Sequence, residues 1–242
     1  MKYLRQHIKQ IILSEARFSE LKNLCLYKTH NQTAGEKFYI LFRPQLIDEI
    51  IESQDPLIPT IGSLGRHSEN FVAGVFLESW AEYTGGAVCH GAWEVTKGVA
   101  DEGYGPVIYD IAMADNPEGI FADRSSVSDD AYGLWKFYRE NRYDVDAIPM
   151  DLKSRKWTED PRDDCFWGSG GEQAGVDPLD PDLELEDFLS DPLNYVYKRK
   201  PMSTMRSLEL RSKKLLDRLK VKIPRFDSDH WKIMFMARFW SR

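Results

Sequence analysis

The chain has 242 residues, of which 42% are hydrophobic and 29% charged, and its formal net charge is −7. This length suits one domain with appendages or two small domains. No apolar run approaches the roughly 18 to 20 residues of a membrane-spanning helix, and the basic start lacks the continuous apolar segment of a signal peptide. We therefore exclude a membrane-spanning protein and expect an intracellular one, with no membrane partner.

The three cysteines, Cys25, Cys89 and Cys165, are widely separated in the sequence. A chain of this length does not need disulfide bonds to fold. No two of the three have the spacing of metal ligands, and the neighbouring Cys89 and His90 would point to opposite faces of a strand. We expect reduced thiols and no metal site.

The first third of the chain predicts helices around a short strand. Residues 1 to 27 have apolar positions at helical spacing, separated by basic and polar residues, which predicts an N-terminal amphipathic helix or two helices that need a partner surface. Lys37 to Phe42 is predicted to be a strand. Pro44 then opens a helix that ends before Asp55-Pro56, because proline is well tolerated in a first turn.

The most β-like part of the chain follows. Phe71 to Ser79 and Val88 to Ala100 flank a Gly-Gly turn, which predicts a hairpin. Pro106 to Met113 has apolar residues at helical spacing, and Gly119 to Ala122 is predicted to be a short buried strand. Ser128, followed by two aspartates, marks the start of a second helix, because a serine N-cap and first-turn anions stabilise that end.

The composition changes near Trp157. Residues 157 to 193 combine Asp-Pro pairs, a glycine cluster and an acidic run, so we expect a long acidic loop on the surface. Residues 194 to 242 are predicted to form a basic helical tail. From Lys198 to Arg242 there are 14 Lys or Arg against 4 Asp or Glu, a net charge of +10, whereas the remainder carries −17. The tail either folds onto the acidic body or contacts an anionic partner such as nucleic acid.

One segment has a pattern that is typical of a ligand-binding loop. Residues 95 to 106, Val-Thr-Lys-Gly-Val-Ala-Asp-Glu-Gly-Tyr-Gly-Pro, lead directly from a predicted strand into a predicted helix. Glycines at such a junction leave backbone N–H groups uncovered, and the helix adds its positive end, so the two together can hold a phosphate without a basic side chain. On its own, the Gly-x-Gly pattern also fits an ordinary turn.

The order of these elements resembles a known family. A strand, a Gly-x-Gly loop, a helix, a short strand and a helix that runs from Ala131 to Tyr138 resemble the core of the GNAT superfamily of acyl-CoA-dependent N-acyltransferases. The resemblance covers roughly the middle third of the chain. It implies an α/β fold with a GNAT-like central mixed sheet flanked by helices, which we place at residues 28 to 156. Ala100 stands where that family's loop usually has Arg or Gln, and Trp135 where its later helix often has Tyr.

This resemblance implies a cofactor and a set of site residues. The cofactor would be acetyl-CoA or another acyl-CoA, and the reaction would transfer the acyl group to an amine of unknown identity. Glu94 would be a general base whose pKa its apolar neighbours raise, or a solvated strand carboxylate. Tyr138 would be a general acid for the leaving thiolate, or a packing residue. The implied cofactor-binding residues are Val95, Lys97, Val99, Glu102, Gly103, Tyr104, Gly105 and Pro106.

The N-terminus carries a separate resemblance. A short amphipathic helix followed by Leu13-Ser14-Glu15-Ala16 is similar to the capsid-targeting leaders of T-even-type tailed bacteriophages, which a prohead protease removes after a Leu/Ile-x-Glu triplet. It implies a leader over residues 1 to 15, contact with phage head proteins, and a location in the host cytoplasm or in the virion head. An ordinary surface helix packed on the body has the same pattern. The alternative to an enzyme is a head-associated or internal virion protein that keeps a GNAT-like fold.

Overall fold

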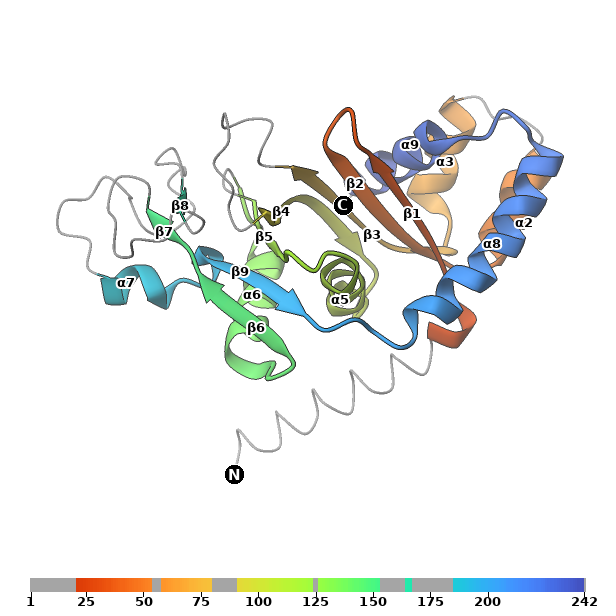
Figure 1. Ribbon diagram of the computed structural model, residues 1–242. Coiled ribbons are helices and arrows are strands. Elements are labelled where there is room, and N and C mark those ends of the chain that lie inside the picture. Colours follow the sequence, from red (N-terminus) through yellow and green to blue (C-terminus); the bar gives the residue numbers. More distant parts are fainter. Residues whose placement is uncertain are drawn as a thin grey trace.

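A seven-stranded mixed sheet forms the centre of the protein, and helices pack on both of its faces (Figure 1). The computed structural model describes residues 21–53, 58–79, 91–123, 126–152, 164–166 and 185–241. The architecture is therefore α/β and is compatible with a GNAT-like fold. None of the helices in these ranges combines the length and the apolarity that crossing a membrane requires.

The strands lie in the order β1-β2-β3-β4-β5-β9-β6. The first four pair antiparallel, β4 and β5 pair parallel, and β9 runs antiparallel to both of its neighbours. Their bounds are β1 Cys25–Asn31, β2 Glu36–Phe42, β3 Phe71–Ser79, β4 Trp93–Ala100, β5 Ile120–Ala122, β6 Val145–Pro149 and β9 Tyr195–Arg199. Two further short strands, β7 (Asp151–Leu152) and β8 (Asp164–Phe166), pair with each other.

The sheet separates two large apolar cores. One core lies between the sheet and the pair α5 (Gly105–Asp115) and α6 (Asp129–Asn141). The other lies on the opposite face, under α2 (Gln45–Ser53), α8 (Met205–Lys222) and α9 (Ser228–Phe239). The remaining helical segments are α3 (Ile58–His67), α7 (Leu185–Ser190) and the 3-10 turns η1 (Leu21–Asn23) and η4 (Pro192–Asn194). Because β4 and β5 are parallel, the chain must cross over between them, and α5 is that crossover.

Most of the elements expected between Lys37 and Asn141 are confirmed. β3 and β4 form the expected antiparallel pair, and α5 and β5 lie where they were expected. The Ser128 hydroxyl caps α6 by accepting a hydrogen bond from the Ala131 backbone N–H at 3.3 Å. The helix expected over residues 1 to 27 is wrong at its end. From Cys25 to Asn31 the chain is a strand, β1, which pairs with β2. Residues 1 to 20, with the expected leader, lie outside the described residues.

Residues 194 to 241 complete the described body of the protein. The β9 strand inserts into the sheet between β5 and β6, α8 packs against β1, and α9 packs against α3. Three cations of this segment pair with carboxylates of the first half of the chain: Arg218 with Asp48 at 2.7 Å, Lys232 with Glu36 at 2.8 Å and Arg238 with Asp101 at 2.8 Å. The described part of the expected tail therefore folds onto the acidic body. Most of the expected acidic loop, residues 157 to 193, lies outside the described residues.

Candidate functional site

The sheet opens between its two parallel strands. β4 and β5 are in register over three residue pairs, from Trp93 opposite Ile120 to Val95 opposite Ala122. β5 ends there, whereas β4 continues to Ala100. Within the described residues, the last five residues of β4 thus have no partner strand on the β5 side.

A β-bulge marks the residue at which the sheet opens. On the β3 side, Leu77 lies opposite Val95 and Phe76 lies opposite Lys97, so Thr96 is an extra residue in β4. Bulges bend a strand and re-aim its groups, and they are over-represented next to active sites. The Thr96 hydroxyl oxygen is buried and has no hydrogen-bond partner among the described residues.

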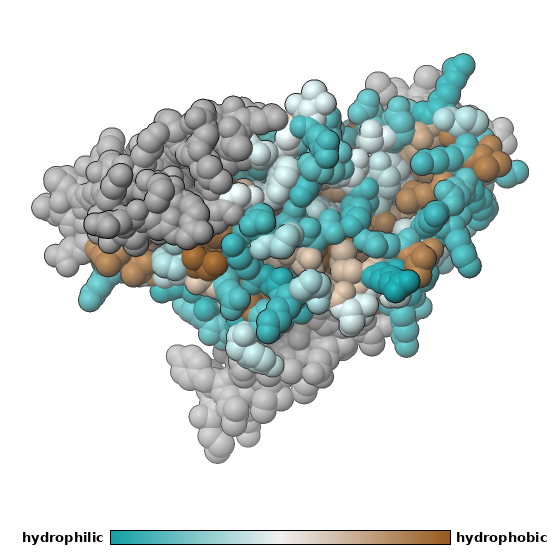
Figure 2. All heavy atoms as spheres, viewed as in Figure 1, coloured by the Kyte–Doolittle hydropathy of each residue, from teal (hydrophilic) through white to brown (hydrophobic). Residues whose placement is uncertain are grey.

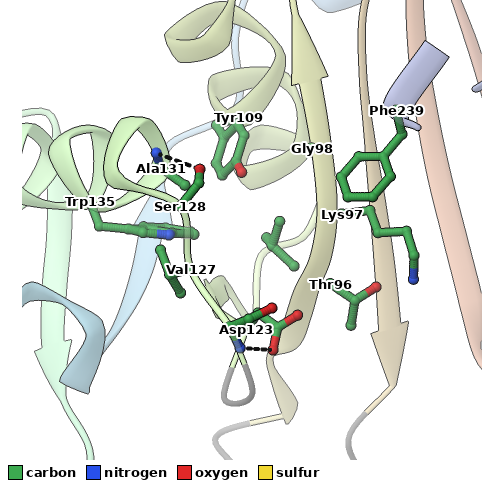
Figure 3. Close-up of a pocket in the computed structure, with 12 residues that line it drawn as sticks. Thr96, Lys97, Gly98, Tyr109, Asp123, Val127, Ser128, Ala131, Trp135 and Phe239 are labelled. Atoms are coloured by element: carbon green, nitrogen blue, oxygen red, sulfur yellow. Dashed lines mark hydrogen bonds between the residues drawn. The ribbon is translucent and has the colours of Figure 1, made fainter. Parts of the chain in front are cut away.

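The opening contains a cavity of about 180 Å³ (Figure 3). Its walls come from β4, from α5, from the loop that leads into α6, and from α9, which contributes Phe239. This volume is below the roughly 300 to 1,000 Å³ of common small-molecule pockets, so the cavity fits a slender chain better than a bulky ligand. Its polar lining residues include Thr96, Lys97, Tyr109, Asp123 and Ser128.

Tyr109 brings a phenol into this cavity. A Cβ atom added at Gly98 would lie only 2.7 Å from the Tyr109 Oη, so the missing side chain of Gly98 lets the hydroxyl approach the β4 backbone (Figure 3). The Tyr109 ring meets Trp135 edge to face, with 5.3 Å between the ring centroids. Burial, and secondarily the negative charge of Asp123, raise the pKa of Tyr109 well above its usual range. The phenol is therefore held in its protonated form and can donate a hydrogen bond into the cavity.

Tyr138, the expected general acid, lies elsewhere. Its side chain is fully buried, and its hydroxyl donates a hydrogen bond to the Pro106 carbonyl at 2.8 Å. It sits beside the buried carboxylate of Asp110, which pairs with Arg142 and Arg199. Burial is the main cause of a strong upward shift in its pKa. Tyr138 is absent from the cavity lining, so its position fits the packing role better than the acid role.

Glu94 also lies outside the cavity lining. Glu94 and Val95 are neighbours on β4, so their side chains point to opposite faces of the sheet, and Val95 points into the core under α5. Glu94 is half-buried, opposite Glu78 on β3 and Phe121 on β5. A base at this position would act on an acceptor that approaches from the face opposite α5.

The expected cofactor-binding residues divide into three groups. Val95 and Lys97 line the cavity, whereas Val99 is buried in the core on the α9 side. The loop from Glu102 to Pro106 forms the entrance to α5. There Gly103 has φ of +79° and occupies the third position of a turn closed by a hydrogen bond from the Tyr104 N–H to the Asp101 carbonyl at 3.0 Å. The turn alone thus requires a glycine at this position.

The turn does not require the second glycine, Gly105, which is the first residue of α5. Apart from its chain neighbours and its own helix backbone, no atom of the described residues lies within 4 Å of a Cβ added at Gly105. The space beside this positively polarised helix end is open, as an approaching phosphate requires. The loop therefore meets one geometric requirement of the expected phosphate cradle.

Sequence reasoning missed several cavity residues. It did not single out Thr96, Tyr109, Asp123 or Phe239 as lining one cavity. Only Gly98 carried a local signal, since a glycine inside a strand often marks a close approach by another group. The bulge at Thr96 and the contribution of α9 depend on long-range packing.

The comparisons with known proteins add no relative. No protein-family model, curated protein or solved structure matches the chain. The chemistry of the cavity must therefore be inferred from its own residues and their geometry.

Proposed function

We propose that the protein is an acyl-CoA-dependent N-acyltransferase-like protein, which binds the acyl-pantetheine arm of acyl-CoA between β4 and β5 and transfers the acyl group to an amine. The observation that carries the proposal is the opening of the sheet after Val95, with the bulge at Thr96 and a narrow cavity inside it. A phage origin remains a prediction from the N-terminal motif.

The shape of the opening supports a pantetheine arm. Pantetheine is a thin chain with two amides, and a strand edge with free backbone groups binds such a chain as it would bind an added strand. From Thr96 to Val99, β4 has no partner strand on the β5 side within the described residues, and this stretch would offer those groups. The cavity is too small for the nucleotide end of the cofactor, which would remain outside near the α5 N-terminus.

The reaction would form one C–N bond and break one C–S bond. The amine nitrogen attacks the thioester carbonyl, the amine loses a proton, and the leaving thiolate gains one. A backbone N–H of β4 next to the bulge can stabilise the oxyanion that develops on the carbonyl. The Tyr109 phenol, which lines the cavity, would take the acid role expected of Tyr138. Glu94 would accept the amine proton through water if the acceptor approaches from the opposite face.

The proposal is tested by adding one methyl group at the entrance to α5. Gly105→Ala places a methyl where phosphate would approach, and Gly133→Ala adds the same group to the exposed side of α6. Outside its own helix, neither new carbon meets an atom of the described residues within 4 Å. Both variants should fold, because alanine is the better helix former. Calorimetry should show acetyl-CoA binding to wild type and Gly133→Ala, and binding weakened at least about tenfold in Gly105→Ala. If wild type gives no heat at high micromolar acetyl-CoA, the proposal fails.

A second candidate function is a head-associated or internal virion protein that keeps the fold without CoA chemistry. Ala100 supplies no side-chain cation to the glycine loop, which favours this candidate. So do four exposed lysines of α8, Lys213, Lys214, Lys220 and Lys222, none of which forms an ion pair with a described residue. Hydrophilic residues dominate the edge of the molecule where α8 lies (Figure 2). Such a surface suits contact with nucleic acid phosphates.

A further inference from the structure

A cavity of about 610 Å³ lies at the edge of the sheet where η1, α2, α8 and the N-terminus of α5 meet. Its lining includes Lys22, Arg43 and Arg211, together with Gln45 at the start of α2 and Tyr104 at the N-cap of α5. It shares no lining residue with the β4–β5 cavity. Its volume is that of a common small-molecule site.

The charge of this cavity is strongly one-sided. Its lining holds three cations and no carboxylate, and none of the three forms an ion pair with a described residue. The Arg43 guanidinium donates to the Glu69 carbonyl, and the Arg211 guanidinium donates to the Leu21 carbonyl at 2.6 Å. These bonds hold the two guanidinium groups in place, while their charges remain uncompensated within the described part of the chain.

Arg211 also carries an unsatisfied donor. Its Nε is buried and has no hydrogen-bond partner among the described residues. A buried charged donor without a partner is costly, so its persistence needs an explanation. An oxyanion in the cavity would supply the charge that opposes the Arg211 guanidinium.

Backbone groups also make the electrostatic potential of this cavity more positive. α2 begins at the cavity wall with Gln45, after Pro44, and Tyr104 places the N-terminal end of α5 at the same cavity. The N-terminal ends of helices carry partial positive charge and uncovered N–H groups, both of which favour a bound anion. Arginine is well suited to phosphate, because its planar fork of N–H donors matches two phosphate oxygens.

We infer that this cavity binds the phosphate or pyrophosphate group of a small ligand. Two sources share that chemistry: the phosphate end of a nucleotide cofactor such as CoA, and an independent phosphorylated metabolite. The inference goes beyond the proposed acyl transfer and does not require it, since the cations and the cavity volume are separate from the β4–β5 opening.

Inorganic pyrophosphate is the probe for the test. Calorimetry on the full chain should show binding to wild type and binding about tenfold weaker in Lys22→Met and in Arg211→Met, because each loses one charge-assisted contact. Lys136→Met is the matched control: it removes an exposed lysine of α6 outside the cavity lining and should bind like wild type. Lys22 is exposed and makes no ion pair with a described residue, so its variant should fold even if Arg211→Met does not.

The outcomes separate the explanations. Absence of pyrophosphate binding to wild type overturns the inference, and so does equal weakening by Lys136→Met, which would indicate a diffuse surface charge. A second titration, into protein saturated with CoA, identifies the source. Competition assigns the cavity to the phosphate end of the cofactor, and an unchanged affinity assigns it to an independent ligand. If CoA does not bind at all, the proposed acyl transfer fails while the pyrophosphate result still decides the inference.

Discussion

The contact between Gly98 and Tyr109 is the most specific feature of the β4–β5 cavity, and Gly98→Ala tests it directly. The new Cβ would lie 2.7 Å from the Tyr109 Oη, 3.4 Å from its Cε2 and 3.5 Å from its Cζ. The first distance is too short for any stable contact, whereas the other two are ordinary contacts. The hydroxyl alone therefore obstructs the methyl group.

The size of the destabilisation by Gly98→Ala depends on how tightly the Tyr109 ring is packed. Tyr109 is 6% exposed and packs against Trp135, so its hydroxyl cannot move by the required several tenths of an ångström without shifting neighbours. Overpacking of this kind costs about 1 to 3 kcal/mol. In a protein of this size, each 1 kcal/mol shifts the Tm by about 2 to 4 °C. Gly98→Ala should therefore lower the Tm by up to about 12 °C.

A double-mutant cycle isolates the hydroxyl. Tyr109→Phe removes the obstructing oxygen, so Gly98→Ala made in the Tyr109→Phe background should cost at least about 1 kcal/mol less than in wild type. Urea unfolding followed by tryptophan fluorescence gives the four free energies. Equal costs in the two backgrounds would refute the reasoning, because the methyl group would then clash with something other than the hydroxyl. If Tyr109 is the general acid, Tyr109→Phe should also reduce acyl transfer by about 100-fold or more while leaving acetyl-CoA binding intact.

Two further predictions concern charge. Arg142 donates hydrogen bonds to Asp144 at 2.6 and 2.8 Å and thereby lowers the pKa of that carboxyl. The resulting stability is complete above the carboxyl's ordinary pKa of 3.8 and is lost as the pH falls through the lower folded value. Asp144→Asn should thus destabilise by no more than about 1 kcal/mol at pH 7, since the site is partly exposed, and the difference from wild type should vanish in acid unfolding curves. If α8 contacts nucleic acid, duplex DNA should bind at low salt and dissociate steeply as salt rises, and Lys213→Glu with Lys214→Glu should weaken binding; no binding of wild type at low salt would contradict this.

The sequence determined the elements whose signals are local. β3 coincides with the predicted Phe71 to Ser79, because a run of apolar and β-branched residues suits a buried strand. Ser128 and its two aspartates defined the start of α6, since N-caps act within one turn. The strand, glycine loop and helix around Gly103 were also predictable. The turn that needs positive φ there is formed by consecutive residues, so its requirement for glycine is a local signal.

The tertiary structure alone decided how distant segments combine. β9 is separated from β5 by more than 70 residues, yet lies beside it in the sheet, and no local pattern encodes such a pairing. Whether Tyr109 or Tyr138 faces the cavity depends on how α5 and α6 are rotated against the sheet, which the packing of Trp135 and the gap at Gly98 fix. The opening itself exists because β5 ends at Ala122 while β4 continues, with a bulge at Thr96. The strand pairing, the orientation of the two tyrosines and the opening all depend on contacts between elements that are far apart in the sequence. Local sequence patterns predict the elements, but they do not predict which elements contact one another.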